Sequence, residues 1–246
     1  MKVAVCGIGK AGQSVINMIN SCQDIQLELV INREESKSIG KNVGQYMGQK
    51  NSSVNIYSIK NCKEELCSNK IDVIIDFSNR ELTKELLILC ENLGINLVIC
   101  TTDFSEKEEK EIAEIGKRKK IGIVYAPNLT IGINFLMHFT KSISKISQGF
   151  NYEIIEYHRK EKGIPSTTAR KISETIEGKN VPIHSVRAGN HIGVHEVVIA
   201  NENESIKIIH ESLNRDAFAK GAILAARFVL NRKGFFKMSD VIMELE

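Results

Sequence analysis

The feature that most constrains the fold is a glycine pattern close to the start of the chain. Residues 2–6 form a short apolar run typical of a buried strand, and Gly7-Ile8-Gly9-Lys10-Ala11-Gly12 follows at once. The apolar spacing over 11–22 predicts a helix directly after it. In such a unit the first glycine makes the tight turn, the second lets a pyrophosphate approach the backbone, and the third lets helix and strand pack closely. Because the helix N-terminus also offers free N–H groups, we predict that this turn binds a dinucleotide.

The remainder of the first half alternates two kinds of segment. Apolar runs typical of buried strands lie at 26–31, 72–76, 96–100 and 121–125, and charged segments typical of helices lie at 79–93 and 105–119. This alternation favours an α/β fold with a Rossmann-like parallel sheet covered by helices. We therefore expect residues 1–128 to form a dinucleotide-binding domain, with its ligand at the carboxyl ends of the strands.

The end of the second predicted strand bears on the choice of cofactor. A site specific for NAD places Asp or Glu there for the ribose 2′-OH, whereas this chain has Asn32-Arg33. Arg33 could pair with a 2′-phosphate, or it could be a solvated loop residue. Glu34 and Glu35 follow and could still reach the ribose. We predict NADPH or NADH as cofactor, with NADPH slightly favoured.

The second half has a different rhythm. Helices are predicted at 131–147, 168–177 and 215–231, and strands at 152–158, 183–188, 192–200 and 205–211. Alternation in the first of these strands places Glu156 and His158 on one face. Ser166 or Thr167 is a candidate N-cap for the second helix. The last three strands are expected to form an antiparallel meander that turns at 201–204.

Charge and composition exclude several classes of protein. The 33 basic and 30 acidic residues leave a formal charge of +3, which indicates neither a nucleic-acid partner nor a membrane partner. The basic run Lys117–Lys120 ends a predicted helix, where cations complement the helix dipole. No apolar run is long enough to span a bilayer, and the first strand begins too early for a signal peptide to precede it. The 6 cysteines form no CxxC pair, so we expect a cytoplasmic protein.

Beyond these patterns the chain resembles a known family, the 4-hydroxy-tetrahydrodipicolinate (dihydrodipicolinate) reductases of bacterial lysine and cell-wall precursor synthesis. The most specific segment is Glu-Ile-Ile-Glu-Tyr-His-Arg-Lys-Glu-Lys-Gly-Ile-Pro-Ser-Thr-Thr-Ala over 153–169. It is similar to the family pattern E-x-H-H-x-x-K-x-D-A-P-S-G-T-A. Further motifs at family spacings are the glycine turn, Asp76-Phe-Ser78, Thr101-Thr102, Ala126-Pro-Asn128, Ser185–Gly189, Gly193–Glu196, Arg215 and Phe218–Gly221.

The resemblance implies a role for individual residues. It makes His158 and Lys162 the proton-transfer residues, which suits the chemistry of imidazole and ammonium groups. It assigns substrate contacts to Arg159, Ser166, Thr167 and Thr168. Together, the glycine turn, the end of the second strand and the matching motifs predict these cofactor contacts: Gly7, Ile8, Gly9, Lys10, Ala11, Gly12, Arg33, Phe77, Cys100, Thr101, Thr102, Ala126, Asn128 and Leu129.

The resemblance also implies an architecture and a reaction. Residues 129–213 would form an α+β substrate-binding and oligomerisation domain with an open mixed sheet. Residues 214–246 would return as helix to the first domain, and the sheets would join four copies into a homotetramer. The implied reaction is NAD(P)H-dependent reduction of 4-hydroxy-tetrahydrodipicolinate to tetrahydrodipicolinate, a small dicarboxylate.

Three departures from the family pattern bear on the substrate. Arg159 stands where the family has a second histidine, one residue is missing before Pro165, and Thr167 replaces a glycine. Arginine binds carboxylates firmly, and a Cβ at 167 is tolerable only if φ there is negative. We expect these changes to affect substrate affinity more than the type of reaction.

Other interpretations have less support. His191 and His195 would share one face of a strand, but no Cys or Asp completes a ligand set, so we expect no metal. Ser166 lacks a GxSxG elbow, which argues against a nucleophilic triad. Two alternatives remain open: another pyridine-nucleotide dehydrogenase, and a regulatory module that binds NAD(P)H without chemistry.

Overall fold

The computed structural model describes residues 1–49, 52–102, 104–118, 120–176 and 180–244. The chain forms two compact units: unit 1 is Met1–Leu129 together with Phe218–Glu246, and unit 2 is Thr130–Ala217. The boundaries expected from the sequence were 128 and 213. The second boundary falls later because helix α8 (Asp216–Val229) has only its first two residues in unit 2.

Unit 1 is built on a seven-stranded sheet in the order β11-β6-β5-β4-β1-β2-β3, and each strand runs parallel to its neighbours. Its strands are β1 (Lys2–Cys6), β2 (Gln26–Asn32), β3 (Ile56–Ser58), β4 (Val73–Asp76), β5 (Asn96–Ile99), β6 (Gly122–Tyr125) and β11 (Gly234–Lys237). This confirms the α/β prediction. Strands β3 and β11 lie outside the predicted strands, because they are too short for a periodic pattern to reveal.

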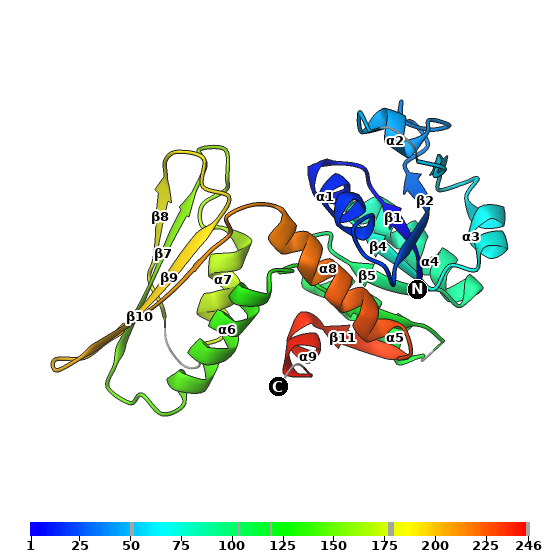
Figure 1. The fold of residues 1–246 in the computed structure, drawn as a ribbon. Helices are drawn as coiled ribbons and strands as arrows, with labels where there is room; N and C mark the ends of the chain where they lie inside the picture. Colours follow the sequence, from blue (N-terminus) through cyan, green and yellow to red (C-terminus); the bar gives the residue numbers. More distant parts are fainter. Residues whose placement is uncertain (50–51, 103, 119, 177–179, 245–246) are drawn as a thin grey trace. The chain divides into compact units, whose positions relative to one another are not determined.

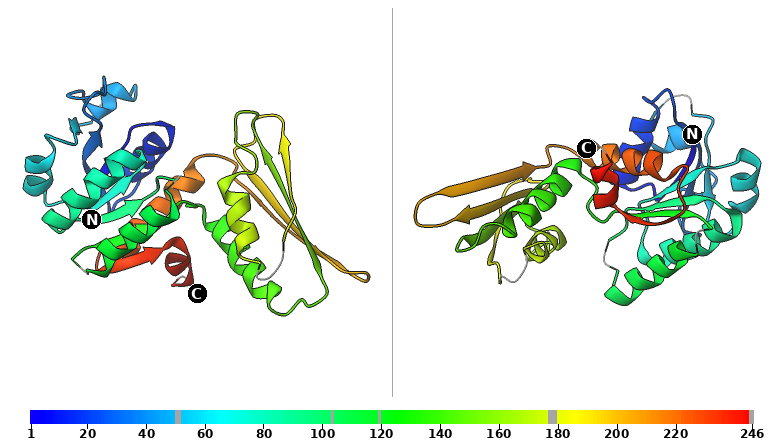
Figure 2. Two further views of the ribbon diagram at one scale, coloured as in Figure 1. Left: turned by 180° about the vertical axis from the view of Figure 1, so that it is seen from behind. Right: turned by 90° about the horizontal axis from the view of Figure 1, so that it is seen from below.

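Helices cover both faces of this sheet (Figures 1 and 2). They are α1 (Lys10–Ile19), α2 (Val43–Tyr46), α3 (Lys63–Asn69), α4 (Arg80–Leu93), α5 (Glu106–Lys117), α8 and α9 (Met238–Met243). On one face Leu66, Leu86 and Ile112 of α3, α4 and α5 pack in a core cluster with strand residues that include Ala4 and Ile74. Because both faces are buried, the strands read as continuous apolar runs.

Unit 2 contains a four-stranded sheet in the order β10-β9-β7-β8. Its elements are α6 (Ile131–Ser144), β7 (Asn151–His158), α7 (Thr167–Glu174), β8 (Ile183–Arg187), β9 (Val194–Ala200) and β10 (Ser205–Glu211). Helices α6 and α7 lie on one face of the sheet (Figure 1), where Leu136 and Ile172 pack with Ile154 and Val197. The predicted helix ends at 119 and 177 lie outside the described residues.

The pairing of β8 corrects the predicted meander. β8 pairs parallel with β7, while β7 pairs antiparallel with β9, so the sheet is mixed. Strands β9 and β7 are the two interior strands, and alternate residues of β7 are buried from Tyr152 to His158. The chain between β8 and β9 passes the end of β7, where the Ala188 N–H donates to the His158 carbonyl at 3.2 Å. The β9–β10 hairpin is confirmed, with the Asn201 N–H bonded to the Glu204 carbonyl at 3.0 Å.

The C-terminal return also differs from the expectation. It was predicted as helix, but it supplies β11 as well, which extends the parallel sheet beside β6. Across the part of the chain that the structure describes, no helix is both long enough and apolar enough to cross a membrane. All six cysteines are free thiols, and four of them, Cys6, Cys62, Cys90 and Cys100, are buried.

Candidate active site

The glycine turn between β1 and α1 has the geometry that phosphate binding requires. Gly7 has a φ of +88°, and a Cβ built there would lie 2.6 Å from the Phe77 carbonyl oxygen. A Cβ at Gly12 would lie 2.0 Å from the Gly7 carbonyl oxygen, so helix and strand are packed too closely for any side chain. Gly9 is the N-cap of α1, and a Cβ there would meet no described atom within 4 Å. Its backbone is therefore open to an approaching ligand.

A cavity of about 340 Å³ lies beside this turn, at the carboxyl ends of β4 and β5. Its lining includes four residues predicted to contact the cofactor, namely Phe77, Cys100, Thr101 and Thr102. Ser78, Asn79, Arg80 and Glu81 complete the lining. The cavity is close to the glycine turn because β1 and β4 are paired neighbours and the backbone of Phe77 and Ser78 lies against Gly7. It is the position at which open parallel sheets bind ligands.

The side chain of Asp76 forms hydrogen bonds to residues that line the cavity. Its carboxylate is fully buried and accepts hydrogen bonds from the Ser78 N–H at 2.9 Å, the Thr83 hydroxyl at 2.5 Å and the Thr101 hydroxyl at 3.4 Å. Burial raises the pKa of this carboxyl, and the hydrogen bonds from Ser78, Thr83 and Thr101 oppose the rise. Asp76 thus ties the β4 loop to the β5 loop. The motif Asp76-Phe-Ser78 did not by itself predict this role for Asp76.

The other predicted cofactor residues lie at the same edge of the sheet or on the first turn of α1. Ile8 is buried, and its carbonyl accepts a hydrogen bond from the Gln13 side chain at 3.0 Å. Lys10 and Ala11 begin α1, whose N-cap makes no side-chain hydrogen bond among the described residues. Ala126, Asn128 and Leu129 follow β6, with Ala126 and Leu129 buried.

Arg33 lies just past the end of β2 on an exposed turn. Its N–H donates to the Asn32 side-chain oxygen at 2.9 Å, and the Asn32 amide donates to the Ser36 and Ser38 hydroxyls at 3.0 and 3.1 Å. Asn32 therefore fixes the course of the turn. In the described ranges no carboxylate pairs with the Arg33 guanidinium, so its cation is available to an anionic ligand.

A second cluster of functional groups lies in unit 2. Strand β7 directs Glu156 and His158 to the same buried face, as the alternation predicted. The Glu156 carboxylate accepts hydrogen bonds from the Ser166 N–H at 3.0 Å, the Ser185 hydroxyl at 2.6 Å and the Arg187 guanidinium at 2.6 Å. Burial acts to raise the pKa of Glu156, but these donors outweigh it and lower the pKa to about 2. Glu156 is therefore a buried anion.

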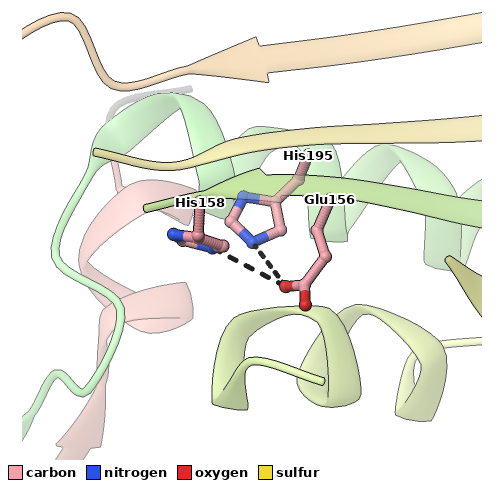
Figure 3. A group of neighbouring side chains, drawn as sticks. All are labelled: Glu156, His158 and His195. Carbon is pink, nitrogen blue, oxygen red and sulfur yellow. Dashed lines mark ion pairs between the residues drawn. The ribbon is translucent and has the colours of Figure 1, made fainter. Parts of the chain in front are cut away.

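Two imidazoles face this anion (Figure 3). His158 Nε2 lies 3.6 Å and His195 Nε2 lies 3.8 Å from Glu156 Oε2, and the two rings contact edge to face with centroids 5.2 Å apart. Burial lowers the pKa of His158; Glu156 opposes the shift, and Lys162 and Arg187 add to it. Burial and the neighbouring His158 lower the pKa of His195 to about 3. Both imidazoles are therefore neutral at pH 7.

The turn after β7 carries Arg159 and Lys162. Lys162 is exposed, and its N–H donates to the Arg159 carbonyl at 3.2 Å, which closes the turn. Arg187 donates from Nε to the Lys162 carbonyl at 3.0 Å and from Nη2 to the Gly163 carbonyl at 2.7 Å. Because Arg187 also binds Glu156, it connects the buried anion to the exposed turn. Arg159 is more than half exposed and lies 3.7 Å from Glu161.

The segment Ser166–Thr168 starts helix α7. Ser166 is the N-cap, and its hydroxyl accepts a hydrogen bond from the Ala169 N–H at 3.1 Å, which confirms one of the two predicted caps. Among the described residues Lys70 is the single non-glycine residue with positive φ, so Thr167 has the negative φ that its Cβ requires. Thr167 is exposed and Thr168 half-buried. A threonine in place of the family's glycine is thus accommodated without backbone strain.

Sequence reasoning missed part of this cluster. His195 and Arg187 received no role, and Glu156 was placed only on the face of His158. Alternation within β9 is the signal that could have placed His195, since it is buried on the same face as Val197 and Ile199. The expected pairing of His191 with His195 on one strand face is wrong. His191 precedes β9 and is exposed, because the chain there is still crossing the end of β7.

A parallel sheet with an open glycine turn, together with a separate unit that carries a histidine–carboxylate cluster, defines a pyridine-nucleotide-dependent oxidoreductase. Two family models match this chain: "Dihydrodipicolinate reductase, N-terminus" over residues 1–129 and "Dihydrodipicolinate reductase, C-terminus" over residues 132–242. The chain belongs to the dihydrodipicolinate reductase family.

Individual relatives agree with this assignment. The 4-hydroxy-tetrahydrodipicolinate reductase of Buchnera aphidicola (subsp. Schizaphis graminum) is 35% identical over 99% of this chain and 97% of its own length. The enzyme of the same name from Ralstonia nicotianae is 31% identical over 98% and 99%. In fold, the chain is similar to the dipicolinate-bound dihydrodipicolinate reductase of Paenisporosarcina sp. TG-14, with a TM-score of 0.80, 23% identity, and 96% and 97% of the two chains covered.

Proposed function

We propose that this protein reduces 4-hydroxy-tetrahydrodipicolinate to tetrahydrodipicolinate with NADPH or NADH, a step of lysine and diaminopimelate synthesis. The observation that carries the proposal is the cluster of His158 and Glu156 with the adjoining Lys162 turn, on the segment that matches the family most specifically. The relatives named for this reaction support it over nearly the whole length of the chain.

The cofactor belongs to unit 1, and the residues present there fit it. The open backbone at Gly9 and the first-turn N–H groups of α1 would receive the pyrophosphate. Phe77, Cys100, Thr101 and Thr102 in the neighbouring cavity would surround the rest of the nucleotide. Arg33 would take a 2′-phosphate, which is the reason to favour NADPH slightly. When bound, the reduced nicotinamide supplies a hydride to the substrate.

Proton transfer belongs to unit 2. His158 Nδ1 lies 3.1 Å from the Ile192 carbonyl, so the ring exchanges its proton at Nε2. Burial keeps the free imidazole neutral, but a bound dicarboxylate would raise the pKa of His158 through its negative charge. Lys162 would stabilise negative charge that develops on the substrate. Arg159, Ser166, Thr167 and Thr168 would hold the two carboxylates.

A coupled assay tests this function and separates it from its two alternatives. Enzymatically made 4-hydroxy-tetrahydrodipicolinate should cause loss of NADPH absorbance that depends on the protein. A different dehydrogenase would leave the absorbance unchanged with this substrate but oxidise the cofactor with another carbonyl or imine compound. A regulatory module would bind NADPH and consume it with none of them. The His158 and Lys162 constellation argues against such a module.

We also propose self-association through the face of the mixed sheet opposite α6 and α7, as a homotetramer. This face carries apolar side chains that are half-buried or exposed: Ile155, Tyr157, Val186, Val194, Val198 and Ile209. Val186 and Ile209, on the two edge strands β8 and β10, are 37% and 60% exposed, and apolar side chains exposed on one face of a sheet mark a surface that a partner can cover. Ile209→Lys should lower the mass measured by sedimentation, whereas the turn variant Asn203→Lys should not. An unchanged mass in Ile209→Lys would count against the interface.

We place the protein in the cytoplasm. Six free cysteines, four of them buried, suit a reducing compartment, and a biosynthetic reductase finds its cofactor there. Fractionation of cells that express the tagged protein tests this placement.

A further inference from the structure

Three possible metal-ligand atoms converge in the buried cluster of unit 2, and one of them, His195 Nε2, also lies 3.4 Å from the Ser166 hydroxyl. His158 Nε2 and His195 Nε2 lie 3.6 and 3.8 Å from Glu156 Oε2, and one ligand atom from each residue falls within 4.8 Å of the others. Figure 3 shows both rings directed at the same carboxylate oxygen. The three side chains are at most 7% exposed. We propose that Glu156, His158 and His195 form a binding site for a divalent transition-metal ion of the zinc class, and that the ion inhibits the enzyme.

The hydrogen bond at the far side of His158 fixes which nitrogen can bind. His158 Nδ1 lies 3.1 Å from the Ile192 carbonyl oxygen, which can only accept, so Nδ1 carries the proton. Nε2 then presents a lone pair toward Glu156, and within the described ranges it has no hydrogen-bond partner although it is buried. A histidine that donates its other N–H to a carbonyl is the usual arrangement of a metal ligand. The buried, unpartnered Nε2 is therefore accounted for if a cation occupies the cluster.

Glu156 is held in the orientation that a ligand needs. Oε1 receives the Ser185 hydroxyl and the Arg187 guanidinium, both at 2.6 Å, so those two donors do not compete for Oε2. Oε2 accepts the Ser166 N–H at 3.2 Å and keeps its remaining acceptor capacity toward the two rings. Ligand atoms around a tetrahedral zinc ion lie about 3.3 Å apart when the bonds are ~2.0–2.1 Å long. The two nitrogen–carboxylate separations of 3.6 and 3.8 Å exceed that value by a few tenths of an ångström, and all three ligand atoms lie within 4.8 Å of one another.

The ligand set selects the class of ion. Two neutral imidazoles and one carboxylate suit Zn²⁺ and its neighbours in the transition series, whereas Mg²⁺ and Ca²⁺ prefer oxygen ligands throughout. Three protein ligands leave a fourth position for water or for another ligand. Arg187 offsets the charge of Glu156, so binding should be weaker than at zinc sites that hold a fold together. The sequence offered no such site because residues 156, 158 and 195 meet only through the pairing of β7 with β9.

Inhibition rests on the proposed function. The ion would bind the His158 Nε2 lone pair, which is the atom that carries the proton in the proposed reaction. A metal-bound imidazole nitrogen cannot take up or deliver a proton, so turnover should fall as the site fills. The geometry of the site does not depend on that role, and metal binding can be measured apart from catalysis.

Titration of the full chain with Co²⁺ tests the site, because Co²⁺ absorbs visible light when nitrogen ligands hold it at low coordination number. The wild type should bind one ion per chain, with an absorption band that Zn²⁺ displaces. His195→Phe keeps a ring of similar shape without its lone pairs and should weaken binding at least about tenfold. His158→Gln should do the same. His184→Phe removes a histidine that pairs with Glu153 on the exposed face of the same sheet, and it should bind Co²⁺ like the wild type.

The outcomes separate the site from the reaction. Equal binding by His195→Phe and the wild type, in protein whose circular dichroism is unchanged, would overturn the site, as would loss of binding in His184→Phe. If Zn²⁺ slows NADPH oxidation, and chelation reverses the effect, the inhibitory role is supported. Stoichiometric binding without inhibition would overturn that role and leave the site standing. A protein that binds Co²⁺ but turns over no substrate would count against the proposed function alone.

Discussion

The two units of this protein present functional groups in different ways. In unit 1 the candidate cofactor site consists largely of backbone and open space: a glycine turn, uncapped N–H groups and a cavity at the strand ends. In unit 2 the candidate site consists of charged and titratable side chains, with Glu156 at its centre and Arg187 bridging to the Lys162 turn. Substitutions in unit 1 should therefore act through shape, and those in unit 2 through charge and proton transfer.

Lys162→Ala should have the largest effect on turnover. It also gives the clearest test that unit 1 binds the cofactor while unit 2 carries out proton transfer. We expect turnover to fall by roughly 10²- to 10⁴-fold, the range for loss of an acid–base or charge-stabilising group. The NADPH dissociation constant should not change, since the candidate cofactor contacts are in unit 1. Steady-state rates and fluorescence titration measure the two quantities. The matched control is Lys160→Ala on the same exposed turn, which should keep its activity. A collapse of cofactor affinity with activity intact would mean that the division between the units is wrong.

Gly9→Val tests the contribution of backbone shape in unit 1. A Cβ at this position would meet no described atom within 4 Å, so we expect the protein to fold, but the valine side chain would fill the space that the pyrophosphate needs. We expect NADPH affinity to fall by more than about a hundredfold, or ~2.7 kcal/mol. Calorimetric titration measures the affinity, and circular dichroism checks the fold.

Gly12→Ala tests the close packing of α1 against the glycine turn, whereas Gly9→Val tests the space left for the ligand. Its Cβ would lie 2.0 Å from the Gly7 carbonyl oxygen, so this variant should lose stability as well as binding. Unchanged NADPH affinity in folded Gly9→Val would remove the claim that this turn binds the cofactor.

Arg33→Ala tests the contact proposed between unit 1 and the 2′-phosphate. Loss of a hydrogen-bonded charge pair with a 2′-phosphate should weaken NADPH binding by about 1.5–3 kcal/mol, roughly ten- to more than a hundredfold. NADH binding should barely change. The difference should shrink as salt rises, because an exposed ion pair is screened. Dissociation constants for both cofactors at two ionic strengths decide the matter, and equal losses for NADH and NADPH would exclude a phosphate contact.

The smallest expected effect is on the free energy of unfolding, and it concerns the carboxylate of Glu108, which lies outside both candidate sites. Glu108 of α5 pairs with Lys84 and Arg80 of α4, and it closes a capping box with Ser105. Lys84, Ser105 and Arg80 hold the pKa of Glu108 well below its usual range. A lowered folded-state pKa stabilises the fold above the ordinary glutamate value of about 4.3, and the benefit shrinks as the pH falls below it.

Glu108→Gln should accordingly lower the urea midpoint at pH 7, by an amount that diminishes toward about pH 3. Glu111→Gln removes an exposed carboxylate 3.9 Å from Lys107 and should change the midpoint little at either pH. A Glu108→Gln midpoint that differs from the wild type equally at both pH values would show that its charge contributes nothing.

Local sequence determined much of unit 1 and less of unit 2. The glycine turn and the five predicted strands are short-range patterns. Gly7 is explained by the backbone of the β4 loop and Gly12 by the Gly7 carbonyl, whereas Gly9 faces open space. The cavity also followed from strand order, because the carboxyl ends of parallel strands share one edge. The strands that were missed, β3 and β11, have only three and four residues and carry no measurable period.

The side-chain cluster of unit 2 depends on pairing between distant segments. Alternation placed Glu156 with His158, but Ser185 and Arg187 reach Glu156 only because β8 pairs with β7 rather than with β9. The choice of partner strand for β8 depends on contacts between segments that are distant in the chain. The spacing of residues within 183–200 therefore does not predict that β8 pairs with β7. A second long-range pairing, that of β7 with β9, brings His195 opposite Glu156. Sequence patterns thus recovered the elements, while the tertiary contacts among them determined the site.

The position of β11 has a consequence for synthesis of the protein on the ribosome. The sheet of unit 1 gains its last strand from residues 234–237, after the whole of unit 2 has been translated. Helix α8, whose Gly221 has no room for a Cβ beside the Leu129 carbonyl, also arrives late and packs where the chain left unit 1. Unit 2 is contiguous and can collapse first on the nascent chain. The parallel sheet of unit 1 is completed only after β11 has been translated, more than a hundred residues after β6. Until then the edge of β6 that pairs with β11 is unpaired.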